Sequence, residues 1–249
     1  MHFSGPRHIL PRLFPTIGPR NPGIGFAVAS VHEGPPVAVT DDERRLARTM
    51  PPPRRSDFLI GRSALHRAVR AAGMTAGTVL CDGPRPLLPD GLAASISHSC
   101  GVAVSVAGPS DRFRTLGVDL ELGELPVGAA HLVLGEPERD LLGPPSTAAR
   151  RLLTLYSAKE AAFKALSPLL GPAVRGLRDI RLTPIEAGFL ARRAGLPEPC
   201  VRVSVRLLPG DGVLCWAVPY EDRESGSPYS DLHDGPHDSP HDGSYNSRS

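Results

Sequence analysis

The sequence predicts an α+β protein made of two similar halves that meet near residue 123. Strand-like and helix-like segments follow one another as β-α-α-β-β-β before this point and as α-α-β-β-β after it. Apolar residues at every second position indicate strands, and apolar residues three or four apart indicate helices. The length of 249 residues fits one large domain or two small ones. We therefore expect an irregular arm, two α/β halves and a tail, over residues 1–22, 23–122, 123–220 and 221–249.

The first half is expected to begin with one strand and two helices. The apolar segment Gly25–Val31 predicts the strand. Thr40 and Glu43 have the spacing of a capping box, which predicts the start of a helix. This helix should stop at the prolines at 51–53, which cannot continue it. Apolar residues at helical spacing then predict a second helix from Arg54 or Arg55 to Ala72.

The remainder of the first half reads as short strands separated by turns. A weak strand is predicted over 79–81, and the segment 94–96 leads into Ser97-His98-Ser99. The segments 101–107 and 115–122 are both strand candidates, and the connection between them contains Gly, Pro and Asp. We therefore expect these two segments to pair as a hairpin.

The second half is expected to begin with helices and to end with strands. Helices are predicted over about 135–142 and 148–165, and a strand over 178–182. The segments 200–207 and 213–218 read as strands on either side of a Pro-Gly-Asp-Gly turn, which predicts a second hairpin.

Composition and charge restrict the kinds of protein this can be. The net charge of +2 is too small to indicate a nucleic-acid partner. The chain has no run of about 18 apolar residues, so we expect no membrane-spanning helix. Prolines interrupt the first 20 residues, which therefore lack the apolar region of a signal peptide, and we expect a cytoplasmic protein. The four cysteines lack C-x-x-C spacing and do not indicate a zinc site.

The tail after residue 220 has a different composition from the rest of the chain. It consists mainly of Ser, Asp, His, Gly, Pro and Tyr. Such a segment has too few apolar residues to order itself, so we expect it to be disordered. Its His233, His237 and His241 could bind a metal ion adventitiously, with a plain disordered tail as the alternative.

Two carboxylates follow an apolar stretch in Gly117-Val118-Asp119-Leu120-Glu121. In a strand, Asp119 and Glu121 point to one face, and Val118 and Leu120 point to the other. Two neighbouring carboxylates repel each other unless a cation lies between them. Hard oxygen ligands suit Mg²⁺ that also holds substrate phosphates. A solvated strand face is the alternative explanation, since Asp-x-Glu is a common sequence.

A helical stretch about 40 residues later holds the only two lysines among 28 basic residues. Lys159 and Lys164 flank Glu160 there. Retaining lysine in an arginine-rich chain suggests a site that needs a compact ammonium group. Taken alone, Glu160 and Lys164 could equally form an exposed helical ion pair. Together with the two strand carboxylates, these residues could hold a metal-bound diphosphate and support phosphoryl transfer.

Several further residues could contact phosphate groups. Ser97 and His98 follow a short strand, although they could also form a capping cluster or a core histidine. Arginines near the start of a helix favour phosphate, because both the guanidinium and the helix N-terminus attract anions. Most arginines of an arginine-rich chain nevertheless serve solubility. The arginines considered for this role are Arg54, Arg55, Arg62 and Arg85.

In chain order, these motifs resemble those of the 4′-phosphopantetheinyl transferases, specifically the two-halved type that activates polyketide and non-ribosomal peptide synthetases, such as the surfactin and enterobactin synthetases. The resemblance covers about residues 40–220. Tyr156 stands where the family usually has Trp, and Pro84 is an additional residue in its turn. The five motifs are Phe58-Leu59-Ile60-Gly61-Arg62, Gly83-Pro84-Arg85-Pro86, Ser97-His98-Ser99, Gly117-Val118-Asp119-Leu120-Glu121 and Tyr156-Ser157-Ala158-Lys159-Glu160-Ala161-Ala162-Phe163-Lys164.

The resemblance implies a pseudo-dimer of two α/β halves with the active site and its coenzyme A in the cleft between them. Asp119, Glu121 and Glu160 would hold Mg²⁺, or Mn²⁺ in its place, against the coenzyme A diphosphate. Glu160 would also act as general base on a serine of an apo carrier protein, and Lys164 would neutralise the leaving 3′,5′-ADP. The other implied contacts to coenzyme A phosphates come from Lys159, Lys164, Ser97, His98, Arg54, Arg55, Arg62 and Arg85.

Two other functions remain open from the sequence. A Mg²⁺-dependent phosphodiesterase would use water in place of a protein acceptor, and a coenzyme A- and carrier-binding module would lack catalysis. The presence of all three carboxylates and both lysines favours the transferase. The implied partners are coenzyme A and apo acyl or peptidyl carrier proteins, and the implied state is a monomer.

Overall fold

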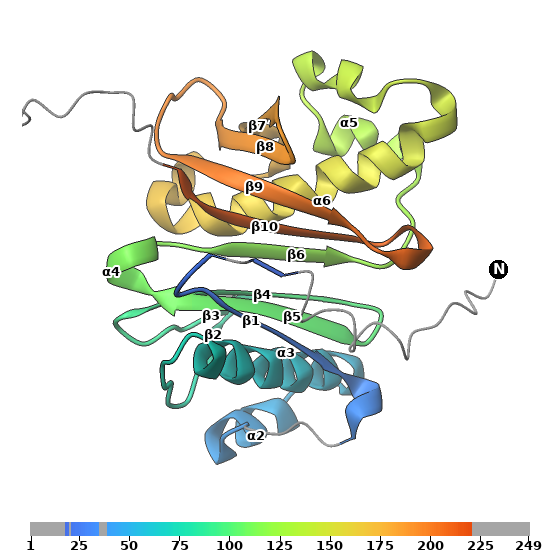
Figure 1. Cartoon of the computed structure of the whole chain (residues 1–249). Helices are drawn as coiled ribbons and strands as arrows, with labels where there is room; N and C mark the ends of the chain where they lie inside the picture. The colour runs from blue at the N-terminus through green and yellow to red at the C-terminus, as the bar shows by residue number, and fades with distance from the viewer. Residues whose placement is uncertain (1–17, 20, 35–38, 221–249) are drawn as a thin grey trace, which may run out of the picture.

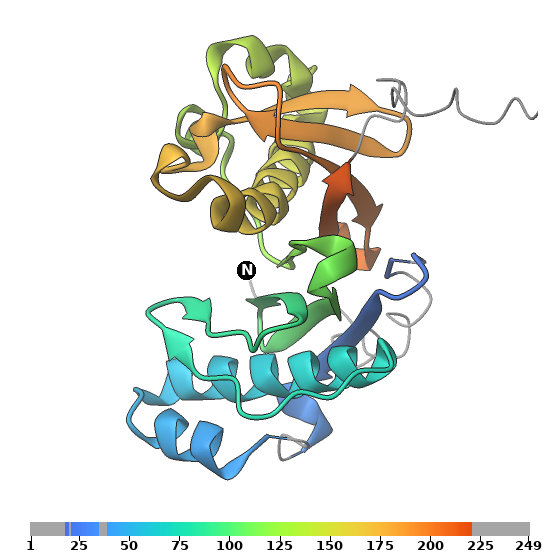
Figure 2. The ribbon, with the colours of Figure 1, turned by 90° about the vertical axis from the view of Figure 1, so that its left-hand side faces the viewer.

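The computed structural model describes residues 18–19, 21–34 and 39–220, so the predicted tail and nearly all of the predicted arm lie outside the described residues. The chain forms two α/β halves, which confirms the predicted α+β fold class (Figure 1). A three-stranded sheet and a five-stranded sheet each pack against one long helix. Figure 2 shows the N-terminal half below the C-terminal half.

The N-terminal half follows the predicted order with shifted boundaries. Thr40 and Glu43 form the predicted capping box, with the Glu43 amide donating to Thr40 Oγ1 at 3.3 Å. The second helix begins at Pro52 and not at Arg54. Backbone amides in the first turn of a helix have no partner within the helix, so a proline, which lacks this amide, is tolerated there. The elements are β1 Gly25–Ser30, η2 Val31–Glu33, α2 Asp41–Arg48, α3 Pro52–Ala71, β2 Cys81–Asp82, β3 Arg85–Pro86, β4 Leu92–Ser99, β5 Val102–Pro109 and α4 Ser110–Phe113.

The C-terminal half has one strand more than predicted, Gly188–Arg193, and its predicted hairpin is confirmed by the pairing of 200–207 with 213–220. The helix predicted over 135–142 is a 3-10 helix. The elements are β6 Gly117–Glu121, η3 Val127–Ala129, α5 Ala130–Val133, η4 Glu136–Leu142, α6 Pro145–Leu170, η5 Gly171–Ala173, η6 Leu177–Asp179, β7 Ile180–Ile185, β8 Gly188–Arg193, β9 Cys200–Leu207, η7 Pro209–Asp211 and β10 Val213–Tyr220.

The predicted hairpin between 101–107 and 115–122 is wrong. β5 pairs with β4 and β1, whereas β6 pairs with β10 of the other sheet. Cys100 and Gly101, with φ angles of 51° and 76°, form the tight turn that joins β4 to β5. Two positive φ angles in a two-residue loop match the twist of a hairpin, so this turn pairs β5 with β4. β6 is then free to become an edge strand of the five-stranded sheet.

Serine side chains join the two sheets where β4 lies beside β6 (Figure 1). Alternate residues of β4 point toward β6. Ser95 Oγ accepts from the Val118 amide at 3.1 Å, and Ser99 Oγ accepts from the Leu122 amide at 3.1 Å. Between them, Ser97 Oγ donates to Asp119 Oδ1 at 2.9 Å. Hydroxyl groups therefore replace part of a backbone ladder between the halves.

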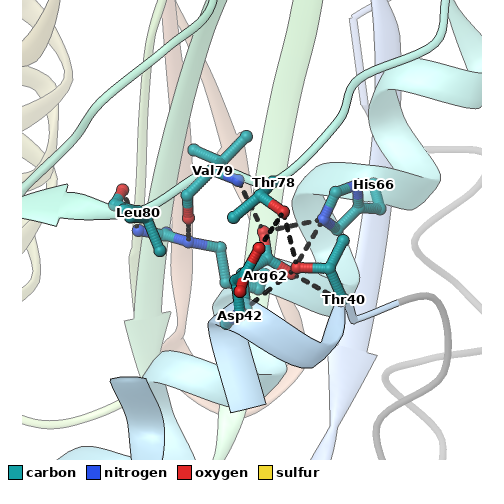
Figure 3. Close-up of polar contacts among 8 residues, drawn as sticks. Thr40, Asp42, Arg62, His66, Thr78, Val79 and Leu80 are labelled. Carbon is teal, nitrogen blue, oxygen red and sulfur yellow. Dashed lines mark hydrogen bonds and ion pairs between the residues drawn. The ribbon is translucent and has the colours of Figure 1, made fainter. Parts of the chain in front are cut away.

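A buried carboxylate organises the N-terminal half (Figure 3). Glu43 is fully buried, and its oxygens accept from the Thr40 amide at 2.9 Å and the Val79 amide at 2.8 Å. His66 Nε2 on α3 lies 2.9 and 3.0 Å from the two oxygens. We call Thr40, Glu43, His66 and Val79 the N-terminal hub. It ties the start of α2, the middle of α3 and the chain before β2 together.

The C-terminal half contains a matching arrangement. Glu138 is buried, and its oxygens accept from the Gly135 amide and the Leu182 amide, both at 2.9 Å. Lys159 on α6 donates to Glu138 Oε2 at 2.6 Å. We call Gly135, Glu138, Lys159 and Leu182 the C-terminal hub. It fixes α6 against η4 and β7, and so determines where the next residue of α6 stands.

Candidate active site

Asp119 and Glu121 lie on the face of β6 that α6 covers. Their cross-strand partners Cys215 and Val213 belong to the core packed against α6, whereas Val118 and Leu120 pack into the core between the sheets. This confirms the predicted alternation. A Cβ at Gly117 would overlap the Ala161 carbonyl, so glycine allows α6 to approach the strand closely.

Two side chains of α6 meet these carboxylates. Lys164 Nζ donates to Asp119 Oδ1 at 2.7 Å and to the Val118 carbonyl at 3.1 Å. Glu160 lies one turn earlier on the same face and is half-buried. The Tyr156 hydroxyl donates a hydrogen bond to the Glu160 carboxylate. Two elements about 40 residues apart therefore form one cluster of three carboxylates and one ammonium.

The cluster shifts the pKa values of its own members. Burial, with help from the charges of Asp119 and Glu160, raises the pKa of Glu121 to about 7, although Lys164 opposes the shift. Burial also raises the pKa of Glu160, against the effect of Lys164. Burial raises the pKa of Tyr156 as well, so its hydroxyl stays protonated and remains a donor. Carboxylates with raised pKa values in a cleft are typical of sites that exchange protons or bind cations.

The donor set fits a hard divalent cation. Asp119 Oδ2 is buried and has no hydrogen-bond partner among the described residues, so it is available as a ligand. Within the ranges that the structure describes, no group of three His, Cys, Asp or Glu side chains is closely enough arranged to hold a metal ion alone. Mg²⁺ does not need such a cage, because it usually binds one or two carboxylates, several waters and substrate phosphates.

Two adjoining cavities open beside this cluster. The first, of about 320 Å³, is lined by Glu160 and Lys164 of the C-terminal half and by Arg85 and Ile96 of the N-terminal half. The second, of about 440 Å³, lies within the N-terminal half. Its charged and polar lining residues are Arg54, Asp57, Arg62 and His98. Pro84, Pro86 and Ile96 line both cavities, so the two form a continuous site.

Comparison with known proteins identifies the family to which this arrangement belongs. Residues 42–108 match the model of the 4′-phosphopantetheinyl transferase N-terminal domain, and residues 115–217 match that of the 4′-phosphopantetheinyl transferase superfamily. The chain belongs to the 4′-phosphopantetheinyl transferase superfamily. It is therefore a transferase enzyme, and the non-catalytic module considered above is set aside.

Curated relatives agree with this assignment. Enterobactin synthase component D of Salmonella typhi is 30% identical over 181 residues, covering 71% of this chain and 74% of that protein. The 4′-phosphopantetheinyl transferase Svp of Streptomyces mobaraensis is 31% identical over 65% of this chain and 67% of that protein. PptT of Mycobacterium tuberculosis is 30% identical over 58% of this chain and 65% of that protein. In the described part of this transferase, no helix has the length and apolarity needed to cross a membrane.

Two predicted phosphate contacts of the transferase lie elsewhere in the structure, and both are corrected. Lys159 is fully buried and donates to Glu138 and to the Leu177 and Ile180 carbonyls, so its three ammonium protons are all used inside the protein. It faces the C-terminal hub because adjacent helical residues point in different directions. Arg55 donates to the Ala47, Arg48 and Met50 carbonyls, and so caps the end of α2.

The remaining predicted residues lie in or beside the site, in different ways. Arg62 is buried and donates to the Val79 and Leu80 carbonyls (Figure 3). It also stacks on Phe58, so only part of its guanidinium faces the cavity. Ser97 donates to Asp119 and lines neither cavity. His98 is exposed, and its Nδ1 lies 3.8 Å from Asp57 Oδ2. Arg54 is exposed and donates to the Gly83 carbonyl at 3.4 Å.

Glu138 and Asp57 were not predicted from the sequence. Glu138 occupies the third position of a helical turn, the position that Glu43 has in the recognised capping box. The capping-box pattern could not be recognised in the sequence, because the cap residue is Gly135, which has no side chain to complete the motif. Asp57 lies one residue before the Phe58 motif, and only the fold shows that it faces His98.

Proposed function

We propose that this transferase moves the 4′-phosphopantetheine group of coenzyme A to a serine hydroxyl of an apo acyl or peptidyl carrier protein and releases 3′,5′-ADP. The observation that carries the proposal is the cluster of Asp119, Glu121, Glu160 and Lys164 at the edge of a cavity lined by both halves. A phosphoryl transfer needs a base, a cation to neutralise phosphate and a long binding surface, and all three occur here together.

Asp119, Glu121 and Glu160 would hold Mg²⁺ as part of this proposal. When bound, the ion would neutralise the charge of the coenzyme A diphosphate and orient its oxygens. The unpartnered Asp119 Oδ2 supports this role, and Ser97 and Lys164 orient the other oxygen of the same carboxylate. The raised pKa of Glu121 supports it too, because a cation would relieve the repulsion among the carboxylates.

Glu160 is the proposed general base. Its raised pKa brings it closer to neutral pH, where a base accepts a proton most effectively. The serine proton passes to Glu160 as the serine oxygen forms its bond to the phosphorus next to the pantetheine. The bond from this phosphorus to the oxygen of the neighbouring phosphate breaks, and Lys164 offsets the charge that develops on that leaving oxygen. Tyr156 orients the base through its hydrogen bond.

The N-terminal half would bind the nucleotide end of coenzyme A. Arg54, Arg62 and His98 line the 440 Å³ cavity and carry or can carry positive charge, which suits phosphate groups. Arg85 lines the neighbouring cavity beside Glu160 and Lys164. In this arrangement the N-terminal half supplies binding and the C-terminal half supplies reactive charge.

Incubation with coenzyme A, Mg²⁺ and a panel of apo carriers from fatty-acid, polyketide and peptide synthases tests the proposal. Mass spectrometry should show a carrier heavier by one phosphopantetheine group, and the panel would define which carriers are used. Cleavage of coenzyme A in the absence of any carrier would instead support the phosphodiesterase. Unmodified carriers throughout the panel, with coenzyme A intact, would contradict the proposal.

A further inference from the structure

The outer face of the five-stranded sheet carries arginines that the proposed reaction does not use. Leu182, Ala191 and Val201 pack against α6 on the inner face. Side chains alternate along a strand, so their neighbours Arg181, Arg192 and Arg202 point outward. Arg206 lies on the same side of β9, four residues beyond Arg202. We call Arg181, Arg192, Arg202 and Arg206 the arginine face.

Two of these arginines stand directly opposite each other. Arg181 on β7 is the cross-strand partner of Arg192 on β8, and both are half-buried. Like charges at opposed positions of antiparallel strands repel each other. Neither guanidinium has a hydrogen bond or an ion pair with any other residue that the structure describes. The pair therefore has no ion-pair partner in the described part of the chain.

The same pair lines a cavity of about 540 Å³ at the β7 edge. Arg193 also lines it, and the other lining residues are neutral, among them Pro137, Leu141 and Leu196. A cavity with three arginines and no carboxylate in its lining favours an anionic occupant. Guanidinium groups recognise carboxylates through paired N–H donors, so an acidic peptide segment suits it.

We propose that the arginine face binds the acidic segment of this same chain that follows β10. One row of cross-strand partners runs from Tyr220 to Cys200, from Cys200 to Arg192 and from Arg192 to Arg181. The chain thus leaves β10 in line with the arginine pair. Three strand spacings of about 4.8 Å separate Tyr220 from Arg181. About five extended residues cover that distance.

The segment after β10 is acidic and therefore opposite in charge to the arginine face. Residues 221–249 contain seven Asp and Glu residues and only two Arg. Three of the acidic residues, Glu221, Asp222 and Glu224, follow Tyr220 at once and are within reach of the opposed pair. The segment therefore supplies the missing counter-charge and covers a basic surface that would otherwise attract other acidic chains. This inference does not depend on the proposed transfer reaction.

Binding of the separate segment tests the proposal first. A chain ending at Tyr220 is mixed with a fluorescent peptide of residues 221–249, and anisotropy is followed at low salt. The peptide should bind, and combined Arg181→Ala and Arg192→Ala substitutions should weaken binding at least tenfold. Arg70→Ala, an exposed arginine of α3, is the matched control and should have no effect. A peptide that does not bind, or that binds the double variant equally well, would overturn the proposal.

The full chain provides a second test. Backbone amides of β7 and β8 should exchange hydrogen more slowly in the full chain than in the chain ending at Tyr220, and the double substitution should abolish this difference. Identical exchange in the two chains would overturn the proposal. Displacement of the bound peptide by coenzyme A would also overturn it, because the peptide would then occupy the cleft. Neither readout requires transferase activity, so failure here and failure of the proposed function are distinguishable.

Discussion

The two halves of the molecule share a scaffold but differ in the charges they carry. Each half begins with a glycine that lies under its long helix: Gly25 lies against Ala68, and Gly117 lies against Ala161. Each half also has a hub in which a buried glutamate caps a helical turn, accepts from a backbone amide further along the chain and contacts a basic side chain of the long helix. The basic hub residues, His66 and Lys159, each lie two residues before the alanine that contacts the glycine.

These matching anchors align the halves residue by residue. The residues two and four positions after the glycine are Ala27 and Ala29 in the N-terminal half, and Asp119 and Glu121 in the C-terminal half. The residue after the basic hub residue is Arg67 in the first half and Glu160 in the second. Arg67 donates to the Val28 carbonyl and to Glu33, and so serves structure. The shared scaffold therefore carries the carboxylate cluster in one copy only, which fits the proposed division between a half that binds and a half that reacts.

The largest effect is expected for Glu160, the residue at which the two halves differ most in the proposed role. Glu160→Gln should reduce the turnover number by about 10²–10⁴-fold, because the amide cannot accept the serine proton. Coenzyme A affinity, measured by calorimetry, should change little. The control is the matching residue of the other half: Arg67→Gln should reduce turnover less than threefold. Equal losses at the two positions would contradict a single reactive half.

The second effect concerns the hubs, which we expect to differ in strength. Lys159→Met leaves the Glu138 carboxylate buried without its cation and should lower the free energy of unfolding by about 3–5 kcal/mol. His66→Leu leaves Glu43 with two backbone donors and should cost about 1–3 kcal/mol. Denaturant unfolding monitored by circular dichroism measures both. Equal stability of Lys159→Met and the unsubstituted protein would refute a structural role for this lysine.

The third effect concerns Ser97, which joins β4 of the N-terminal half to Asp119 of the carboxylate cluster. Ser97→Ala removes a hydrogen bond to a charged carboxylate and should cost about 1.5–3 kcal/mol of stability. Ser99→Ala, which removes only a bond from a neutral amide, is the control and should cost about 1 kcal/mol. Mg²⁺ affinity should fall for Ser97→Ala alone. Indistinguishable variants would show that Ser97 does not orient Asp119.

The smallest effect is a pH dependence confined to the C-terminal half. The pKa of Glu121 is raised to about 7, so a proton competes with Mg²⁺ for this carboxylate below that pH. Calorimetric titration should show Mg²⁺ affinity falling about tenfold per pH unit below 7. Glu121→Gln should flatten this profile. A flat profile in the unsubstituted protein would contradict the assignment of Glu121.

The same raised pKa has an opposite consequence for stability. Between about pH 4.5 and 7 the folded protein binds more protons at Glu121 than the unfolded chain does. In the absence of Mg²⁺, the contribution of Glu121 to the free energy of unfolding should therefore fall as the pH rises through this window. Saturating Mg²⁺ should reduce the fall, since the ion binds the ionised form.

Local patterns in the sequence predicted the fold class, the Thr40 capping box and the shared face of Asp119 and Glu121, because these depend on neighbouring residues. The partner of β6 was not predictable in the same way, since β10 lies almost 100 residues further along the chain. The assumption that neighbouring segments pair therefore failed there. The domain boundary near residue 123 stays a prediction, and β6, which precedes it, pairs with the sheet of the C-terminal half.

Lys159 shows a second limit of reading the sequence alone. Its position next to Glu160 and the scarcity of lysine both suggested a role in the reactive centre. One residue along a helix changes the direction of a side chain by about 100°, and that rotation takes Lys159 into the hub. The position of Lys159 does need a compact ammonium group, as the scarcity of lysine suggested, because three acceptors surround its Nζ in a buried site.

The central claim is that the N-terminal half binds coenzyme A while the C-terminal half reacts. Steady-state kinetics of Arg54→Ala and Arg85→Ala, with Arg202→Ala of the arginine face as control, test it most directly. Each cavity substitution should raise KM for coenzyme A about tenfold, the loss of one charged hydrogen bond. The kcat should remain within about twofold, and the control should change neither constant. An unchanged KM with a reduced kcat for the cavity variants would contradict this division between the halves.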